Sequence, residues 1–170
     1  MQTTDTTYAQ ILHSYTRVRF QDADPFNHLN NSKYIDYMIN AREDQVEQAY
    51  GLDFNQIARE QGLGWIVAQQ QVAYLRPART AERLYIDSQL VNYSAKHLFA
   101  EIRMWDEAQS HLKSFLWIHF MPIDLQQQRL YAHTDALMTL FESVQLPVEQ
   151  QVFEERSLYW RQYNKAQRNA

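Results

Sequence analysis

The sequence of 170 residues contains no cysteine and only three glycines. Without cysteine the chain cannot form a disulfide, a thiolate zinc site or a cysteine nucleophile. The glycines, Gly51, Gly62 and Gly64, do not have the spacing of a P-loop or of a dinucleotide-binding fingerprint. No apolar run approaches the ~20 residues of a membrane span, and residues 1–11 are too polar for a secretory signal. We therefore expect a cytoplasmic protein without a membrane span or a cofactor.

Charge and motif content exclude further classes of protein. Twenty acidic residues against sixteen basic ones give a net charge of −4, so no polybasic surface for nucleic acid is expected. The serine hydrolase motif G-x-S-x-G is missing. The six histidines show no paired spacing with carboxylates, so no metal site is predicted. Hydrophobic residues make up 45% of the chain, and we expect residues 1–170 to form one domain.

Periodicity predicts an α+β fold in which a five-stranded antiparallel sheet wraps around one long helix. After a polar lead-in over residues 1–12, period-two alternation indicates a strand over 15–20, and turn-forming residues predict a loop over 22–28. The remaining expected elements are helices over 32–50 and 53–61, strands over 65–76, 83–93, 97–105 and 112–122, and C-terminal helices over about 134–143 and 148–165.

The strand predicted over 112–122 carries large apolar side chains on both faces. Alternation places Leu112, Leu116, Ile118 and Phe120 on one face, and Phe115 and Trp117 are among those on the other. One helix covers only one face of a sheet, so the second face needs another cover. This pattern favours a homo-oligomer, and the C-terminal aromatics would pack on the sheet or on a neighbouring subunit.

Four polar side chains fall between the first strand and the long helix: Asp24, His28, Asn30 and Asn31. A helix N-terminus presents unpaired N–H groups and the positive end of the dipole. A carboxylate beside it can attack a carbonyl or activate water while the N–H groups stabilise the developing oxyanion. That combination permits acyl transfer without serine or cysteine. The plainer interpretation is a turn-forming Asp and a capping Asn.

The segment D-A-D-P-F-N-H-L-N-N-S-K-Y at 22–34 resembles the signature of hotdog-fold acyl-CoA thioesterases of the 4-hydroxybenzoyl-CoA thioesterase-like group. It is most similar to the branch with D-x-x-x-H-x-N-N-x-x-Y, which includes plant-type acyl-carrier-protein thioesterases. The resemblance continues through Y-I-D-Y-M-I-N-A-R and V-A-Y-L-R-P-A-R and covers about 15–124. From Thr134 onward, including the extension over about 134–165, no resemblance is recognised.

The resemblance implies a role for each matching residue. Asp24 would be the catalytic carboxylate, acting as nucleophile or general base, and the N–H near Asn31 would polarise the thioester carbonyl. His28 and Asn30 would orient water or the carboxylate. Related enzymes often carry a Glu at the position of Ile39. Because this chain lacks that Glu, Asp24 would be the catalytic carboxylate without it.

Substrate contacts are expected in two places. Tyr34, Tyr37 and Met38 on the long helix would line the acyl pocket. Ser94, Lys96 and His97, in a turn between two strands, correspond to the region near the nucleotide end of coenzyme A (CoA) in the family. A solvated turn is the alternative for that segment.

The expected activity is hydrolysis of an acyl-CoA thioester to a carboxylic acid and CoA by a homodimer or homotetramer. The alternatives are a thioesterase acting on acyl-carrier protein, a non-catalytic acyl-CoA-binding hotdog protein, and an oligomerising domain whose loop is only a capped turn.

Overall fold

The computed structural model describes residues 8–168. Its elements are β1 (Ile11–Arg17), the 3-10 turn η1 (Phe20–Asp22), α1 (Asn31–Tyr50), α2 (Phe54–Gln61), β2 (Leu63–Tyr74), β3 (Arg83–Ser94), β4 (His97–Asp106), β5 (Leu112–Asp124), β6 (Arg129–Leu130), α3 (Asp135–Val144) and α4 (Phe153–Gln167). None of the helices in the described part is long and apolar enough to cross a membrane.

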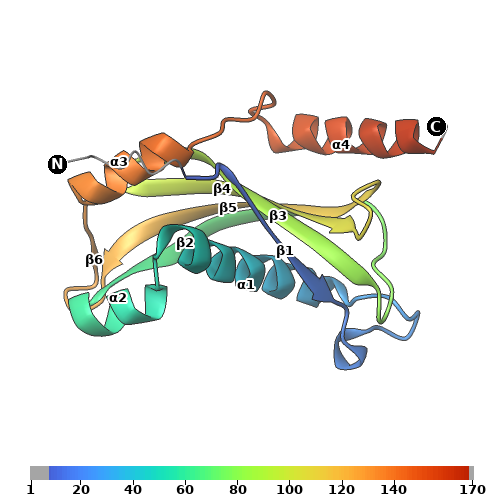
Figure 1. Cartoon of the computed structure of the whole chain (residues 1–170), viewed down its shortest axis with the longest axis horizontal. Coiled ribbons are helices and arrows are strands. Elements are labelled where there is room, and N and C mark those ends of the chain that lie inside the picture. Colours follow the sequence, from blue (N-terminus) through green and yellow to red (C-terminus); the bar gives the residue numbers. More distant parts are fainter. Residues whose placement is uncertain (1–7, 169–170) are drawn as a thin grey trace.

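The strands form one antiparallel sheet in the order β1-β3-β4-β5-β2, and the short β6 pairs with the end of β5. Figure 1 shows this sheet curled around α1, while α4 lies over its other face. The predicted α+β architecture, with a sheet wrapped around one long helix and an additional C-terminal helix, is confirmed.

Helix α1 is delimited by its caps. The side chain of Asn30 accepts a hydrogen bond from the N–H of Ser32 at 3.0 Å, which satisfies one of the free donors of the first turn. At the other end Gly51 adopts a left-handed conformation with φ of 69° and donates its N–H to Glu47. The helix therefore begins directly after the polar loop that the sequence singled out.

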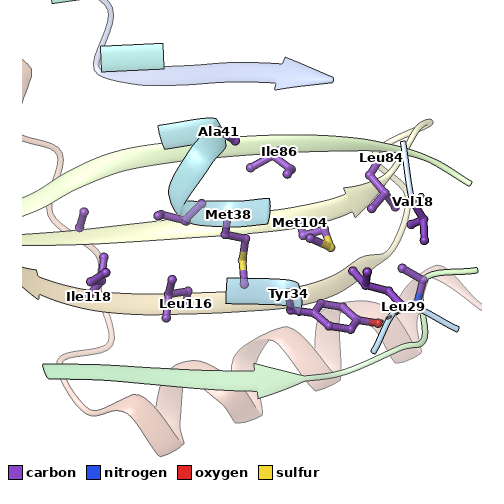
Figure 2. Packing of buried hydrophobic residues seen from close by; sticks show 13 residues of the cluster. Val18, Leu29, Tyr34, Met38, Ala41, Leu84, Ile86, Met104, Leu116 and Ile118 are labelled. Atoms are coloured by element: carbon purple, nitrogen blue, oxygen red, sulfur yellow. Dashed lines mark hydrogen bonds between the residues drawn. The ribbon is translucent and has the colours of Figure 1, made fainter. Parts of the chain in front are cut away.

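The main core lies between α1 and the concave face of the sheet. Tyr34 and Met38 of α1 are 2% and 0% exposed, and they pack among side chains of β3, β4 and β5. Figure 2 shows these two side chains close to Leu29, Met104 and Leu116. Met104 of β4 therefore points toward the helix, on the concave face of the sheet.

The chain's own C-terminal segment covers part of the second face of the sheet. Trp160 of α4 and Val148 pack with Phe115 and Trp117 of β5. The apolar side chains on this face are therefore no argument for an oligomer, and the oligomeric state stays a prediction.

The orientation predicted for Leu112 is wrong. Leu112 joins the cluster under α4 rather than the core around α1. The register between β4 and β5 shifts between the pairs Met104–Ser114 and Trp105–Leu112. This irregularity adds a residue to β5 and reverses the side-chain alternation before it.

Several predicted boundaries also move. The first strand spans Ile11–Arg17, so it includes the end of the expected lead-in, and Phe20 lies in η1. Residues 1–7 of that lead-in, like residues 169–170, lie outside the described chain. Helix α4 begins at Phe153 rather than near residue 148, and β6 was not predicted.

Candidate active site

The loop before α1 is closed by the carboxylate of Asp24. Its Oδ1 accepts hydrogen bonds from the backbone N–H groups of Phe26 and His28, both at 2.9 Å. The N–H of Asp24 in turn donates to the carbonyl of His28 at 2.7 Å. No hydrogen bond to Oδ2 is formed by residues 8–168, and the side chain is half-buried. Asp24 therefore holds the loop with one oxygen while the other stays available.

The same loop is attached to the connection between β2 and β3. The N–H of Leu29 donates to the carbonyl of Ala78 at 2.7 Å, and Thr80 donates its N–H to the carbonyl of Asn27 at 3.1 Å. The Tyr34 hydroxyl accepts a hydrogen bond from the N–H of Ala78 at 2.9 Å. The loop is thus positioned by the crossover segment and by the first turn of α1 together.

The start of α1 follows within a few residues. Asn30 donates its N–H to the carbonyl of Asp22 at 2.9 Å, which ties the helix cap to the loop. Within the described residues the N–H of Asn31 has no acceptor, and its carbonyl accepts from the Tyr74 hydroxyl at 2.9 Å. An unpaired N–H at the positive end of a helix dipole can stabilise negative charge. The structure therefore brings Asp24, His28, Asn30 and Asn31 into one short segment.

The two tyrosines near the start of α1 have shifted pKa values. Burial raises the pKa of Tyr34, and among the smaller contributions is the negative charge of Asp24. Burial also raises the pKa of Tyr37, whose hydroxyl accepts from the N–H of Arg19 at 3.0 Å and donates to Oδ2 of Asp22 at 2.7 Å. Both hydroxyls are therefore protonated, and they hold neighbouring segments together through hydrogen bonds rather than act as catalytic bases.

The three residues expected to line the acyl pocket do not line the apolar cavity of the structure. Tyr34 and Met38 belong to the closed core. They line neither the apolar cavity beside the C-terminal half of α1 nor the polar hollow beside β1. Tyr37 faces an open polar hollow beside β1, together with Asp22 and Asn40.

An apolar cavity of about 280 Å³ lies beside the C-terminal half of α1. Its lining comes from seven elements and includes Val46, Phe54, Trp65, Leu90, Leu98 and Phe141. This cavity was not predicted, because its lining side chains converge only in the folded chain. The helical stripe containing Val46 and Tyr50 was the one signal present in the sequence.

Ser94, Lys96 and His97 are far from Asp24 within one chain. The segment beside the Asp24 loop leads into β3, whose twelve residues span about 35 Å before the turn that carries Lys96. Ser94 and Lys96 are exposed, and Nε2 of the half-buried His97 is 2.8 Å from Nδ1 of His119. Burial lowers the pKa of His97. The side chain of Leu98, directly after this turn, lines the apolar cavity.

No cluster of three or more histidine, aspartate or glutamate side chains in residues 8–168 is arranged to hold a metal ion. The chemistry available at the Asp24 segment is that of a carboxylate, an imidazole and backbone N–H groups.

Comparison with known proteins gives consistent results. The model of the thioesterase-like superfamily matches residues 18–152. The long-chain acyl-CoA thioesterase FadM of Escherichia coli (strain K12) is 28% identical over 116 residues, which are 68% of this chain and 86% of FadM.

Solved structures share the fold. The 1,4-dihydroxy-2-naphthoyl-CoA thioesterase Slr0204 of Synechocystis has a TM-score of 0.70 at 13% identity, covering 79% of this chain and 95% of Slr0204. The Staphylococcus aureus protein SAV2348, solved in complex with CoA, has a TM-score of 0.74 at 15% identity, covering 86% and 93%. With the superfamily match extending over most of its length, the chain belongs to the thioesterase-like superfamily and is a thioester hydrolase with the hotdog fold.

Proposed function

We propose that the protein hydrolyses acyl-CoA thioesters, with Asp24 as the catalytic carboxylate. The observation that carries this proposal is the place of Asp24 in the loop that leads into α1: within residues 8–168 neither its Oδ2 nor the N–H of Asn31 at the start of the helix has a hydrogen-bond partner. Similarity to FadM, a long-chain acyl-CoA thioesterase, supports CoA as the carrier. A helix end of this kind stabilises the oxyanion of an acyl-transfer intermediate.

The free oxygen of Asp24 favours a general-base route. Oδ1 is occupied by two N–H donors, so Oδ2 is the oxygen that accepts a proton from water. The water oxygen forms a bond to the thioester carbon, and the carbonyl oxygen becomes an oxyanion facing the N–H of Asn31. The C–S bond then breaks, the sulfur leaves as a thiolate, and the proton held by Asp24 passes to it. His28 and Asn30 flank this site and orient the water.

The distance between the Asp24 loop and the turn with Ser94, Lys96 and His97 supports a homo-oligomeric assembly. One chain cannot offer the Asp24 loop to the thioester and this turn to the phosphates of the same CoA ester, because the length of β3 separates them. If Lys96 contacts the CoA phosphates, it does so from a second copy. A dimer is the smallest assembly that meets this requirement.

The proposal is tested by thiol release from aromatic, short-, medium- and long-chain acyl-CoA esters. Asp24→Asn keeps the volume and removes the charge, and it should lower kcat by about 100-fold to 10,000-fold. Asp53→Asn is the matched control, because Asp53 also accepts a backbone N–H in a loop but caps α2. Survival of turnover within a few-fold in Asp24→Asn would overturn the assignment. Hydrolysis of acyl-carrier-protein esters but not of acyl-CoA esters would show that acyl-carrier protein, and not CoA, is the carrier.

A further inference from the structure

The apolar cavity beside α1 has one basic residue among its lining side chains, Arg42. In the described chain no acid forms an ion pair with it. Arg103 and Arg156, which are buried on the opposite face of the sheet, each pair with a carboxylate. A charged group in an apolar wall is costly unless another group compensates it. Arg42 is half-buried, and unlike Arg103 and Arg156 it has no acidic partner in the described chain.

A single neutral contact holds the Arg42 guanidinium. Its Nη1 donates to Oγ of Ser88 at 3.0 Å, and the Ser88 hydroxyl donates in turn to the side-chain carbonyl of Gln45. A guanidinium carries five N–H donors, so four of them have no acceptor among residues 8–168. Burial lowers the pKa of Arg42 to about 10, which leaves the side chain charged at neutral pH.

The other polar side chains of the cavity leave few partners for a ligand. The Tyr50 hydroxyl donates to the carbonyl of Ala9 at 2.6 Å, and Nε1 of Trp65 donates to Nε2 of His133 at 3.0 Å. Glu43 lines the same cavity and forms no hydrogen bond or ion pair through its side chain with the described residues. A cation and an acid are thus the two uncommitted polar groups in an otherwise apolar lining.

The size of the cavity limits its ligand. Small-molecule sites for drug-sized ligands measure roughly 300–1,000 Å³. The volume of about 280 Å³ lies below that range, so it suits a segment of an acyl chain rather than the CoA nucleotide.

We infer that Arg42 is a specificity-determining residue that donates hydrogen bonds to a hydroxyl or oxo group carried on the acyl chain, away from the thioester. This inference rests on the proposed acyl-CoA hydrolysis and names its substrate class. A hydroxyl accepts from the guanidinium and can donate to Glu43, so it suits both uncommitted groups, whereas an oxo group accepts from Arg42 only. A carboxylate on the chain would meet the negative charge of Glu43.

The test compares acyl-CoA esters of one chain length without a substituent, with a hydroxyl near the thioester, mid-chain or at the end, and with a terminal carboxylate. The measured quantity is the ratio of kcat/KM for each substituted ester to that for the plain ester. Wild-type protein should prefer at least one hydroxylated ester by about tenfold or more, because a site that binds an oxygen rejects the analogue without it. Arg42→Met should abolish that preference and Arg42→Lys should reduce it. Arg59→Met, an exposed arginine of α2, should keep it.

Three results would overturn the inference: no preference in the wild-type protein, the same preference in Arg42→Met, or a stronger preference for the terminal carboxylate. Calorimetric binding of the free hydroxylated fatty acids gives a readout that needs no turnover. A hydroxylated fatty acid that binds wild-type protein about tenfold more tightly than the plain fatty acid does, with no such difference in Arg42→Met, supports the inference even if no acyl-CoA is hydrolysed. Hydrolysis without any change in the ratio removes the inference and leaves the proposed function intact.

Discussion

Arg156 of α4 binds the carboxylate of Glu101 with two parallel hydrogen bonds. Nε lies 2.8 Å from Oε2, and Nη2 lies 2.7 Å from Oε1. Glu101 is fully buried on β4 and also accepts from Arg103 and from Nε1 of Trp117. A bidentate pair of this kind fixes geometry as well as charge. It attaches the C-terminal helix to the sheet at one defined position.

Removal of one partner should therefore be costly. Arg156→Met leaves Glu101 with one cation in a buried site, and we expect the free energy of unfolding to fall by about 3–5 kcal/mol. Urea denaturation followed by circular dichroism measures it. Arg161→Met, at an exposed position of the same helix, should change stability by less than about 0.5 kcal/mol. Equal midpoints for the two variants would contradict the prediction.

Tyr34→Phe should destabilise the protein through Ala78. The substitution keeps the ring but removes the oxygen that accepts the N–H of the fully buried Ala78. A buried donor without a partner costs about 1–3 kcal/mol. The matched control is Tyr15→Phe, because Tyr15 is 48% exposed and its hydroxyl has no partner in the described chain. If both variants unfold at the same urea concentration, the hydroxyl does not contribute as proposed.

Stability should fall in mild acid because of His133. Trp65 donates its Nε1–H to Nε2 of His133, so the proton of the neutral ring sits on Nδ1 and faces the carbonyl of Ser94 at 2.9 Å. Burial lowers the pKa of His133, and the same is true of His119. As pH falls through the unfolded pKa of about 6.5, the unfolded chain binds protons first, and the free energy of unfolding decreases down to the folded pKa.

Urea titrations between about pH 8 and about pH 5.5 measure this dependence. His133→Gln should show a flatter slope than wild-type protein, whatever its stability at the higher pH. His13→Gln, an exposed residue of β1, should keep the wild-type slope. A wild-type slope in His133→Gln would show that other groups carry the effect.

Features set by neighbouring residues were predictable from the sequence. Asn30 and Gly51 bound the long helix because a capping side chain and a left-handed glycine act within one turn. The turn closed by the Asp24 carboxylate was predictable for the same reason, since the hydrogen bonds of that carboxylate join residues no more than four apart.

Features set by distant contacts were not predictable. Glu101 and Arg103 alternate with apolar residues, a pattern typical of an exposed face. Both are nevertheless buried, because α4 covers them, and its Arg156 binds Glu101 from 55 residues away in the chain. Leu112 was assigned to the wrong face because periodicity cannot reveal a register shift against a partner strand. The cavity lined by Arg42 depends on seven elements at once, so a local pattern such as the apolar stripe of α1 does not reveal it.

The late position of Arg156 has a consequence for synthesis. A nascent chain ending before α4 carries Asp87 and Glu101 against the single charge of Arg103, beside the bare aromatic rings of Phe115 and Trp117. On the ribosome such an intermediate exposes an aggregation-prone surface until α4 emerges. Packing of α4 onto the sheet, rather than formation of the sheet, is then the step that removes these aromatic side chains from self-association.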